Sequence, residues 1–275
     1  MNVTYANTGM LNRRRLIQVG LLTLLASPVI AVNAAMPISA ALNRTARFRG
    51  NSQRCAKAYC QIQLKVMPDF SQELLANVQR QIASNFEALN AANFSGEILS
   101  LFNALRSENV ALINSLGAPA NRASVLAVSQ QADRMFAAAN RLTEGLQVQS
   151  KQTSAQLINQ SGLLRNRSQR LAKNFFLVAA GHDSKDIRDL LSSDRSDFLR
   201  AMDALGKAPI STAAIRNDLG LLQSQWTFFE AALNRRADDE SMRHVATASE
   251  RIHDVGDSLA GLYEAALRDL LGSTS

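Results

Sequence analysis

The sequence predicts an all-α protein built from two tandem antiparallel four-helix-bundle modules that share one long central helix, with about seven helices in total. Three observations lead to this prediction. Aromatic residues make up only 5% of the chain although 47% of it is hydrophobic, apolar residues recur every three or four positions from end to end, and one segment repeats at a constant offset of 116 residues. Few aromatic and β-branched runs disfavour strands, and the spacing of three and four is that of a helix with one buried face.

Composition excludes several other classes. The chain has 275 residues with 13 Gly, 5 Pro and 2 Cys, which argues against collagen-like, disordered and disulfide-stapled proteins. Cys55 and Cys60 are five positions apart on a predicted helix, so their Cα atoms are about 8 Å apart and out of disulfide reach. We expect two buried free cysteines; the alternative is a bridge between two chains.

Residues 1–34 have the features of an export signal. Arg13, Arg14 and Arg15 precede an apolar run from Leu16 to Val32, and Ala34 ends a small-x-small cleavage pattern. The arginines followed by apolar residues resemble a twin-arginine signal, whose pathway exports folded proteins. We therefore expect a periplasmic protein; the alternative is a membrane anchor formed by an uncleaved N-terminal helix. Export also argues against nucleic acid as a partner, although the net charge is +7.

Glycine, proline and capping residues divide the remaining chain. The first two predicted helices end before Pro68-Asp69 and at Asn93–Gly96, and the third ends at Gly117–Pro119. The fourth continues to Gly181–Asp183 and the fifth ends at Gly206–Pro209, while Asp238–Glu240 supply an acidic first turn for the seventh. The predicted helices are 40–67, 70–92, 96–116, 121–180, 184–205, 211–236 and 240–271.

The helix predicted over 121–180 is unusually long because no proline interrupts it. We expect it to form one rod whose halves belong to successive modules. The predicted domains are therefore the signal 1–34, a first module 35–150 and a second module 151–275.

The internal repeat joins residues 43–57 to residues 159–173. The identical pairs are mostly polar, which is unusual for a repeat maintained by core packing. They are Asn43/Asn159, Arg49/Arg165, Ser52/Ser168, Gln53/Gln169, Arg54/Arg170, Ala56/Ala172 and Lys57/Lys173.

Both copies lie in stretches without acidic residues. Residues 35–68 contain six basic residues and no carboxylate, and residues 145–182 contain five and none. Their counter-charge must come from another segment or from a ligand. Because guanidinium groups bind planar oxyanions through two parallel hydrogen bonds, a small oxyanion is the expected ligand. The candidate ligand-binding residues are Arg49, Arg165, Arg54, Arg170, Ser52, Ser168, Lys57 and Lys173. The alternative is that these cations pair with acids of neighbouring helices, such as Glu87, Glu97, Asp133, Glu250 or Asp254.

The second copy resembles a known motif. Asn159, Gly162, Leu164, Arg165, Ser168 and Arg170 have the spacing of the P-box helix of nitrate/nitrite sensor histidine kinases (NarX-like), and the run from Ser168 to Lys173 is similar to the N-terminal module of PilJ-type chemoreceptors of type IV pili. The resemblance implies a periplasmic antiparallel bundle in which the arginine after Gly-x-Leu binds the anion at a dimer seam. That role falls on Arg165 and, through the repeat, on Arg49, with Arg54 and Arg170 as supporting groups. The first copy departs from the motif because Ala46 replaces the glycine. In the second copy, Gln160 stands where the nitrate sensors have a lysine.

These patterns favour a sensory or ligand-binding protein over an enzyme. We expect it to bind a nitrate- or nitrite-like anion, to form a homodimer and to signal through a separate membrane chemoreceptor or sensor kinase. The alternative is a structural or adaptor protein whose modules mediate dimerisation or pilus and chemoreceptor assembly. His182, His244 and His253 lack metal-ligand spacing and no catalytic motif is evident, so no metal, cofactor or catalytic residue is predicted.

Overall fold

The computed structural model describes residues 36–150 and 153–272, and within them every regular element is a helix. The predicted all-α fold is therefore confirmed. The described helices are α1 (Ile38–Gln63), α2 (Pro68–Asn90), α3 (Gly96–Leu116), α4 (Arg122–Ser150), α5 (Thr153–Ala179), α6 (Lys185–Gly206), α7 (Ala213–Leu233) and α8 (Asp239–Gly272). The predicted export signal lies outside the described residues.

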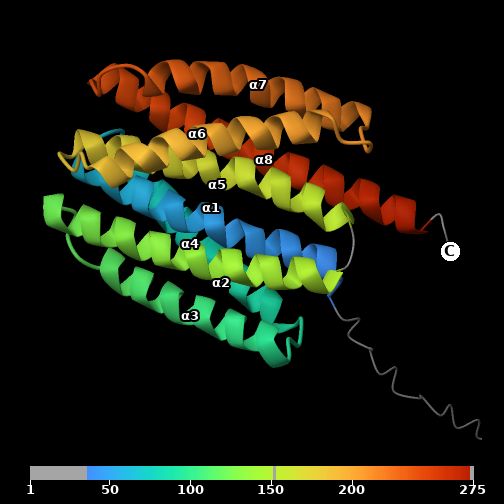
Figure 1. The fold of residues 1–275 in the computed structure, drawn as a ribbon. Helices are drawn as coiled ribbons and strands as arrows, with labels where there is room; N and C mark the ends of the chain where they lie inside the picture. The colour runs from blue at the N-terminus through green and yellow to red at the C-terminus, as the bar shows by residue number, and fades with distance from the viewer. Residues whose placement is uncertain (1–35, 151–152, 273–275) are drawn as a thin grey trace, which may run out of the picture. The chain divides into compact units, whose positions relative to one another are not determined.

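The prediction of a single helix over residues 121–180 is wrong. The chain reverses direction between α4 and α5, which run side by side in opposite directions (Figure 1). Lys173 of α5 forms an ion pair of 2.6 Å with Asp133 of α4, whereas 40 residues of continuous helix would separate them by about 60 Å. The sequence carries no helix-stop signal here, but folding back lets α4 and α5 both pack on α1. Burial of apolar surface outweighs the local preference for a continuous helix.

The other predicted helices are present, with ends that differ from the predicted ones by up to four residues, and side-chain caps explain several of them. The hydroxyl groups of Ser184 and Thr212 accept the backbone N–H groups of the third residues of α6 and α7, at 3.3 and 3.2 Å. Asp238 accepts the N–H of Ser241 at 2.8 Å at the start of α8. Gly181 adopts a φ of +88°, a conformation that glycine adopts without steric cost.

Helices α1 and α5 lie at the centre of the bundle. Helix α1 packs against α2, α4 and α5, and α5 packs against α1, α6 and α8 (Figure 1). Helix α3 packs on α4, and α7 packs on α8. The order of contacts in α1–α4 therefore recurs in α5–α8, and the two sets meet where α1 packs on α5.

Both repeated segments lie on these two central helices, which places their polar side chains inside the bundle. Cys55 and Cys60 of α1 are free and fully buried, as expected, and burial raises the pKa of each thiol to about 12. Across the described ranges, no helix combines the length and hydropathy that a bilayer span requires.

Candidate functional site at the seam between α1 and α5

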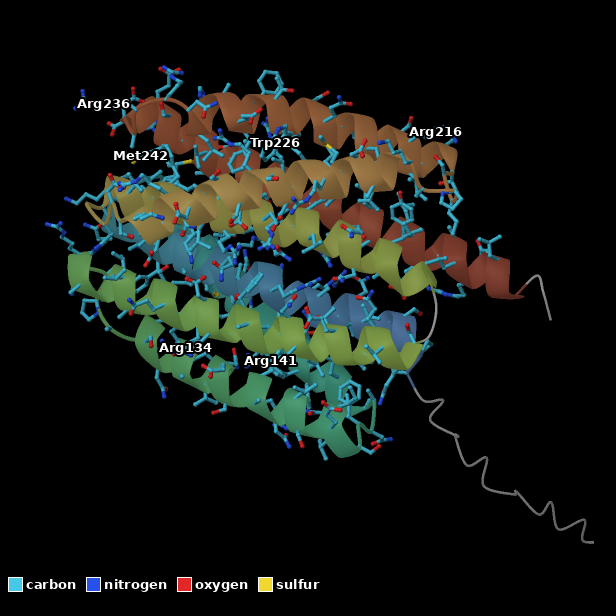
Figure 2. All side chains as sticks on the ribbon, viewed as in Figure 1. Arg134, Arg141, Arg216, Trp226, Arg236 and Met242 are labelled. Carbon is cyan, nitrogen blue, oxygen red and sulfur yellow. The ribbon has the colours of Figure 1, made fainter. Side chains whose placement is uncertain are left out.

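Most of the repeated polar residues are buried, which is rare for arginine and lysine, and only Asn159 and Arg170 among them are partly exposed. Arg49 and Arg165 are each 1% exposed, and Lys57 and Lys173 have no exposed surface. The arginines labelled in Figure 2, such as Arg141 and Arg216, are by contrast exposed. A buried cation is strongly destabilising unless an opposite charge or several hydrogen bonds compensate it, so the partners of each group determine what the seam can do.

The repeated serines and glutamines bind backbone carbonyl groups. Ser52 donates to the carbonyl of Arg49 at 3.0 Å, and Ser168 donates to that of Arg165 at 2.9 Å. Gln53 links α1 to α4 through the carbonyl of Ala132 at 3.1 Å, and Gln169 links α5 to α8 through that of Ser249 at 2.8 Å. The two serines predicted as ligand-binding therefore direct their hydroxyl protons to their own helices.

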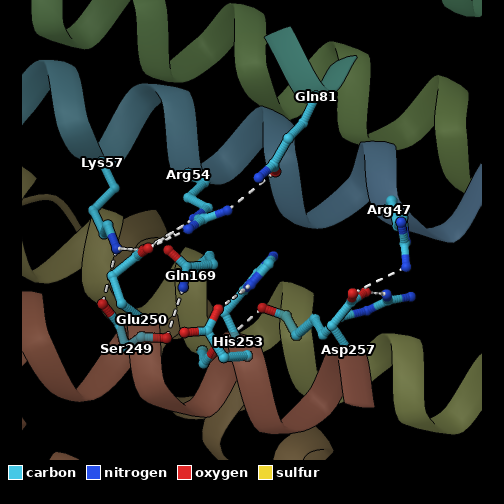
Figure 3. A network of polar contacts seen from close by, with 12 residues as sticks. Arg47, Arg54, Lys57, Gln81, Gln169, Ser249, Glu250, His253 and Asp257 are labelled. Carbon is cyan, nitrogen blue, oxygen red and sulfur yellow. Dashed lines mark hydrogen bonds and ion pairs between the residues drawn. The ribbon is translucent and has the colours of Figure 1, made fainter. Parts of the chain in front are cut away.

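Arg54 and Lys57 share one carboxylate. Glu250 of α8 accepts from Arg54 Nε at 2.9 and 3.0 Å and also forms an ion pair with Lys57 Nζ (Figure 3). Burial alone would raise the pKa of Glu250, but the charges of Lys57 and Arg54 outweigh burial and hold that pKa well below its usual range. Burial lowers the pKa of Lys57 to about 8, although Glu250 opposes this shift.

Arg170 and Lys173 also have carboxylate partners. Arg170 Nε donates to Asp194 of α6 at 2.6 Å, and Lys173 forms the ion pair with Asp133 described above. Asp194 is fully buried and also contacts Arg167 at 3.0 Å. The alternative considered from sequence, pairing with acids of neighbouring helices, is therefore confirmed for the four supporting cations, with Glu250 and Asp133 among the acids named there.

Arg165 has one carboxylate partner. It forms an ion pair with Asp257 of α8, which also accepts from Arg47 at 3.0 Å, and it donates to the Asn43 side chain at 3.3 Å. Burial lowers the pKa of Arg165, and Asp257 opposes this shift. Burial would raise the pKa of Asp257, but Arg165 and Arg47 outweigh burial and lower it.

Arg49 differs from the other motif cations. Its guanidinium donates to the amide oxygens of Asn140 at 3.0 Å and Asn159 at 2.8 Å, and its Nε has no hydrogen-bond partner. In the part of the chain that the structure describes, no carboxylate lies within ion-pair distance of this guanidinium. Burial and the charges of Arg165 and Arg167 lower the pKa of Arg49 to about 9, while Glu144 acts in the opposite direction.

The nearest acid reaches Arg49 only through an amide. Asn140 accepts a hydrogen bond from Arg49 and donates one to Glu144 at 2.7 Å. Glu144 therefore compensates the buried charge of Arg49 only indirectly, through the Asn140 amide. Arg49 is therefore a buried cation held mainly by neutral groups.

Arg49 and Arg165 lie close together beside Gly162. A Cβ atom at Gly162 would stand 2.9 Å from Nη2 of Arg49 and 3.5 Å from Nη2 of Arg165. Two guanidinium groups occupy the space beside residue 162, so a side chain at this position has no room. The structure brings together the two arginines that the repeat predicted, one with an internal carboxylate and one without.

Sequence reasoning missed Asn140 and Asp257. The repeat contained the signal, because with one residue inserted between Leu205 and Arg251 the second half aligns with the first, and this places Asn140 opposite Asp257. Asn43 and Asn159 were recognised as a repeated pair, and each accepts a hydrogen bond from the motif arginine of the other half.

One comparison with known proteins finds a match over part of the chain. Residues 146–252 match the family model described as the N-terminal region of the type IV pili methyl-accepting chemotaxis transducer, PilJ. This segment includes Arg165, Arg170 and Lys173 but not the first copy of the motif. The match supports a PilJ-type helical module with a sensory or signalling role. No curated protein and no solved structure matches the chain.

Proposed function

We propose that this protein is a sensory module of the PilJ type that binds one small monovalent oxyanion, such as nitrate or nitrite, at Arg49. The observation that carries the proposal is the lack of a carboxylate partner for Arg49 within the described residues, although its side chain is 1% exposed. Every other cation among the eight candidate residues has such a partner.

A small oxyanion suits this environment. A bound anion would compensate the charge of Arg49 in a region of low effective dielectric, where the attraction is stronger than in water. A planar oxyanion can accept two parallel hydrogen bonds from a guanidinium, and Arg165, next to Arg49, adds a second positive field. A single negative charge also costs less to dehydrate than two.

The two halves of the chain differ in a way that supports one anion per chain. Asp257 supplies the negative charge for Arg165, whereas Asn140 at the equivalent position is neutral. The sequence predicted that both arginines bind the ligand directly, whereas we propose different roles for the two. Arg49 contacts the anion and Arg165 contributes its positive charge.

Signalling follows from the position of Arg49. Its hydrogen bonds join α1 to α4 and α5, so an anion that takes over these donors would change how the three helices are held together. A ligand shifts a receptor only when it prefers one arrangement, for example a small sliding of packed helices. We propose that a periplasmic form of this protein presents that arrangement to a membrane chemoreceptor or sensor kinase. A homodimer would present two such surfaces.

Calorimetry on the full chain tests the proposal. Nitrate, nitrite, chloride and sulfate are titrated into the wild type, into Arg49→Met, which nearly keeps the side-chain volume, and into Arg141→Ala, which removes an exposed arginine of α4. We expect one nitrate or nitrite per chain with a micromolar Kd, lost in R49M and kept in R141A. Absence of binding by every anion, or equal binding by R49M that is shown to be folded, would contradict the proposal.

A second candidate function is structural. The ion pairs of Arg54, Lys57, Arg170 and Lys173 hold the central helices to α6, α8 and α4, as expected of a seam that only maintains a scaffold. Phe228 of α7 is 69% exposed and lines a groove of about 470 Å³ between α7 and α8, which suits an adaptor that docks a partner. Under this alternative no anion binds, and Phe228→Ser weakens self-association in sedimentation experiments.

A further inference from the structure

A pocket of about 740 Å³ lies between α1, α2 and α8. Figure 3 shows parts of its lining: Arg47 and Arg54 extend from α1, Gln81 from α2, and His253 and Asp257 from α8. Its volume falls within the range of small-molecule sites and greatly exceeds that of a nitrate ion. The two acceptors of Arg49, Asn140 and Asn159, do not line this pocket, so it is separate from the site proposed above.

The side chains that line the pocket carry a net positive charge. Four arginines and two aspartates contribute to it. Arg47 and Arg54 are paired with Asp257 and Glu250. Arg44 and Arg80 have no carboxylate partner in the described ranges, and the only hydrogen bond of Arg80 there goes to the Asn77 amide. Arg44 and Arg80 are therefore the two cations of the lining that are open to a ligand, and Asp254, which among the described residues contacts only His253, offsets part of their charge.

Two buried amides in the lining lack partners. Asn51 of α1 is 2% exposed and Asn85 of α2 is 5% exposed, and neither side chain makes a hydrogen bond to any residue that the structure describes. Their amide atoms are not among the solvent-inaccessible polar atoms that lack a partner, so they reach the pocket instead of standing unpaired in the core. Since both side chains line a pocket, its contents are the partners open to them.

The position related to this pocket by the internal repeat lies between α5, α6 and α4, and it is occupied by side chains. There Arg167 replaces Asn51 and Phe136 replaces His253. The Arg170 guanidinium lies 4.9 Å from the centre of the Phe136 ring, and Asp194 and Asp197 pair with Arg167. At the related position the side chains therefore pair with one another and fill the space, whereas between α1, α2 and α8 they leave a pocket with open hydrogen-bonding groups.

We infer that the pocket between α1, α2 and α8 is a second ligand site, for a small organic dianion that also offers hydrogen-bonding groups. Arg44 and Arg80 bind its two negative charges, and Asn51 and Asn85 bind its hydroxyl or carbonyl oxygens. Dicarboxylates and phosphate monoesters share this chemistry. Because Asp257 lines the pocket and also holds Arg165, occupancy here acts directly on the α1–α5 seam.

The test uses calorimetry on the full chain with succinate, malate, glycerol 3-phosphate, inorganic sulfate and the uncharged diamide of succinate. The variants are Arg44→Ala/Arg80→Ala and Asn85→Leu. Neither variant removes an ion pair within the described residues, and Leu has the same branching and number of side-chain heavy atoms as Asn without its hydrogen-bonding groups. Arg49→Met serves as the control, because it removes the proposed nitrate site and leaves the pocket intact.

We expect one succinate, malate or glycerol 3-phosphate per chain, with affinity at least tenfold weaker in R44A/R80A and unchanged in R49M. The preferred probe distinguishes a carboxylate ligand from a phosphate ester. We also expect N85L to bind more weakly while its midpoint of thermal unfolding is equal to or above that of the wild type, because no internal hydrogen bond is lost.

Three results would overturn the inference. One is no binding of any organic probe at millimolar concentration, and another is binding as tight for sulfate as for the organic dianions. The third is equal binding by wild type and R44A/R80A. If the wild type binds no nitrate but binds a dianion that R49M also binds, this inference stands and the proposed function fails. If the wild type binds nitrate but no dianion, only the proposed function stands.

Discussion

Asn140 accepts a hydrogen bond from Arg49, whereas Asp257, at the equivalent position in the second half of the chain, forms an ion pair with Arg165. A single difference between an amide and a carboxylate therefore determines whether a buried arginine is compensated inside the protein. Removing the opposite charge from a buried ion is strongly destabilising unless something else supplies it.

Asp257→Asn makes the second half resemble the first. Arg165 and Arg47 both lose their carboxylate, and hydrogen bonds to charged groups contribute about 1.5–3 kcal/mol each, so we expect the free energy of unfolding to fall by about 2 kcal/mol. Added nitrate should restore part of this loss, because an anion can now compensate Arg165. Urea unfolding with and without nitrate measures both effects. Asp269→Asn, an exposed change on the same helix, should show neither, and a D257N protein as stable as the wild type would contradict the prediction.

Glu250→Gln removes the carboxylate that Arg54 and Lys57 share. Both cations are buried, so breaking the cluster should cost about 3–5 kcal/mol of unfolding free energy. Glu240→Gln is the matched control on α8, because Glu240 is exposed and its pair with Arg235 should contribute less than about 1 kcal/mol. Chemical unfolding of both variants checks the difference. Equal losses would mean that the buried cluster adds nothing specific.

The same carboxylate predicts a pH dependence. The pKa of Glu250 lies below its unfolded value of 4.5 in the folded protein, because Lys57 and Arg54 outweigh the effect of burial. Its stabilising contribution is therefore complete above pH 4.5 and is lost as the pH falls below that value. We expect the stability difference between wild type and E250Q to shrink as the pH is lowered from about 6 to about 3. A difference that stays constant over this range would contradict the assignment.

Gly162→Ala tests how closely Arg49 occupies the seam. Alanine favours a helix over glycine by about 1 kcal/mol, so Gly220→Ala, which meets no atom within 4 Å, should stabilise α7 by roughly that amount. A methyl group at residue 162 would stand 2.9 Å from Arg49 Nη2 and 3.2 Å from the Ala46 Cβ, so it must displace the guanidinium. We expect G162A to gain less stability than G220A and to bind nitrate more weakly. Equal gains and equal nitrate affinity would contradict the close contact.

Most of the fold could be predicted because its determinants are local. Glycine, proline and capping residues such as Ser184 and Asp238 mark the helix ends directly in the sequence. The reversal between α4 and α5 has no such marker. It results from the packing of both helices on α1, which depends on residues distant in sequence and is invisible to local propensity.

The candidate site was predictable only in part, for a similar reason. The repeat correctly identified Arg49 and Arg165 as equivalent, and the lack of nearby acids in the sequence indicated that their partners come from elsewhere. Which acid meets which arginine depends on the packing of α8 and α6 against the central helices. Glu250 and Asp194 thus compensate Arg54 and Arg170, and Arg49 has only amide oxygens as acceptors.

Nitrate calorimetry on Asn140→Asp measures whether an anion supplies the counter-charge of Arg49. The substitution places a carboxylate beside Arg49, as Asp257 stands beside Arg165, and Asn103→Asp adds the same charge at an exposed position of α3. If the missing counter-charge of Arg49 is what an anion supplies, N140D should stay folded and lose nitrate binding, while N103D binds as the wild type does. Undiminished nitrate binding by N140D would show that the anion does not compensate Arg49.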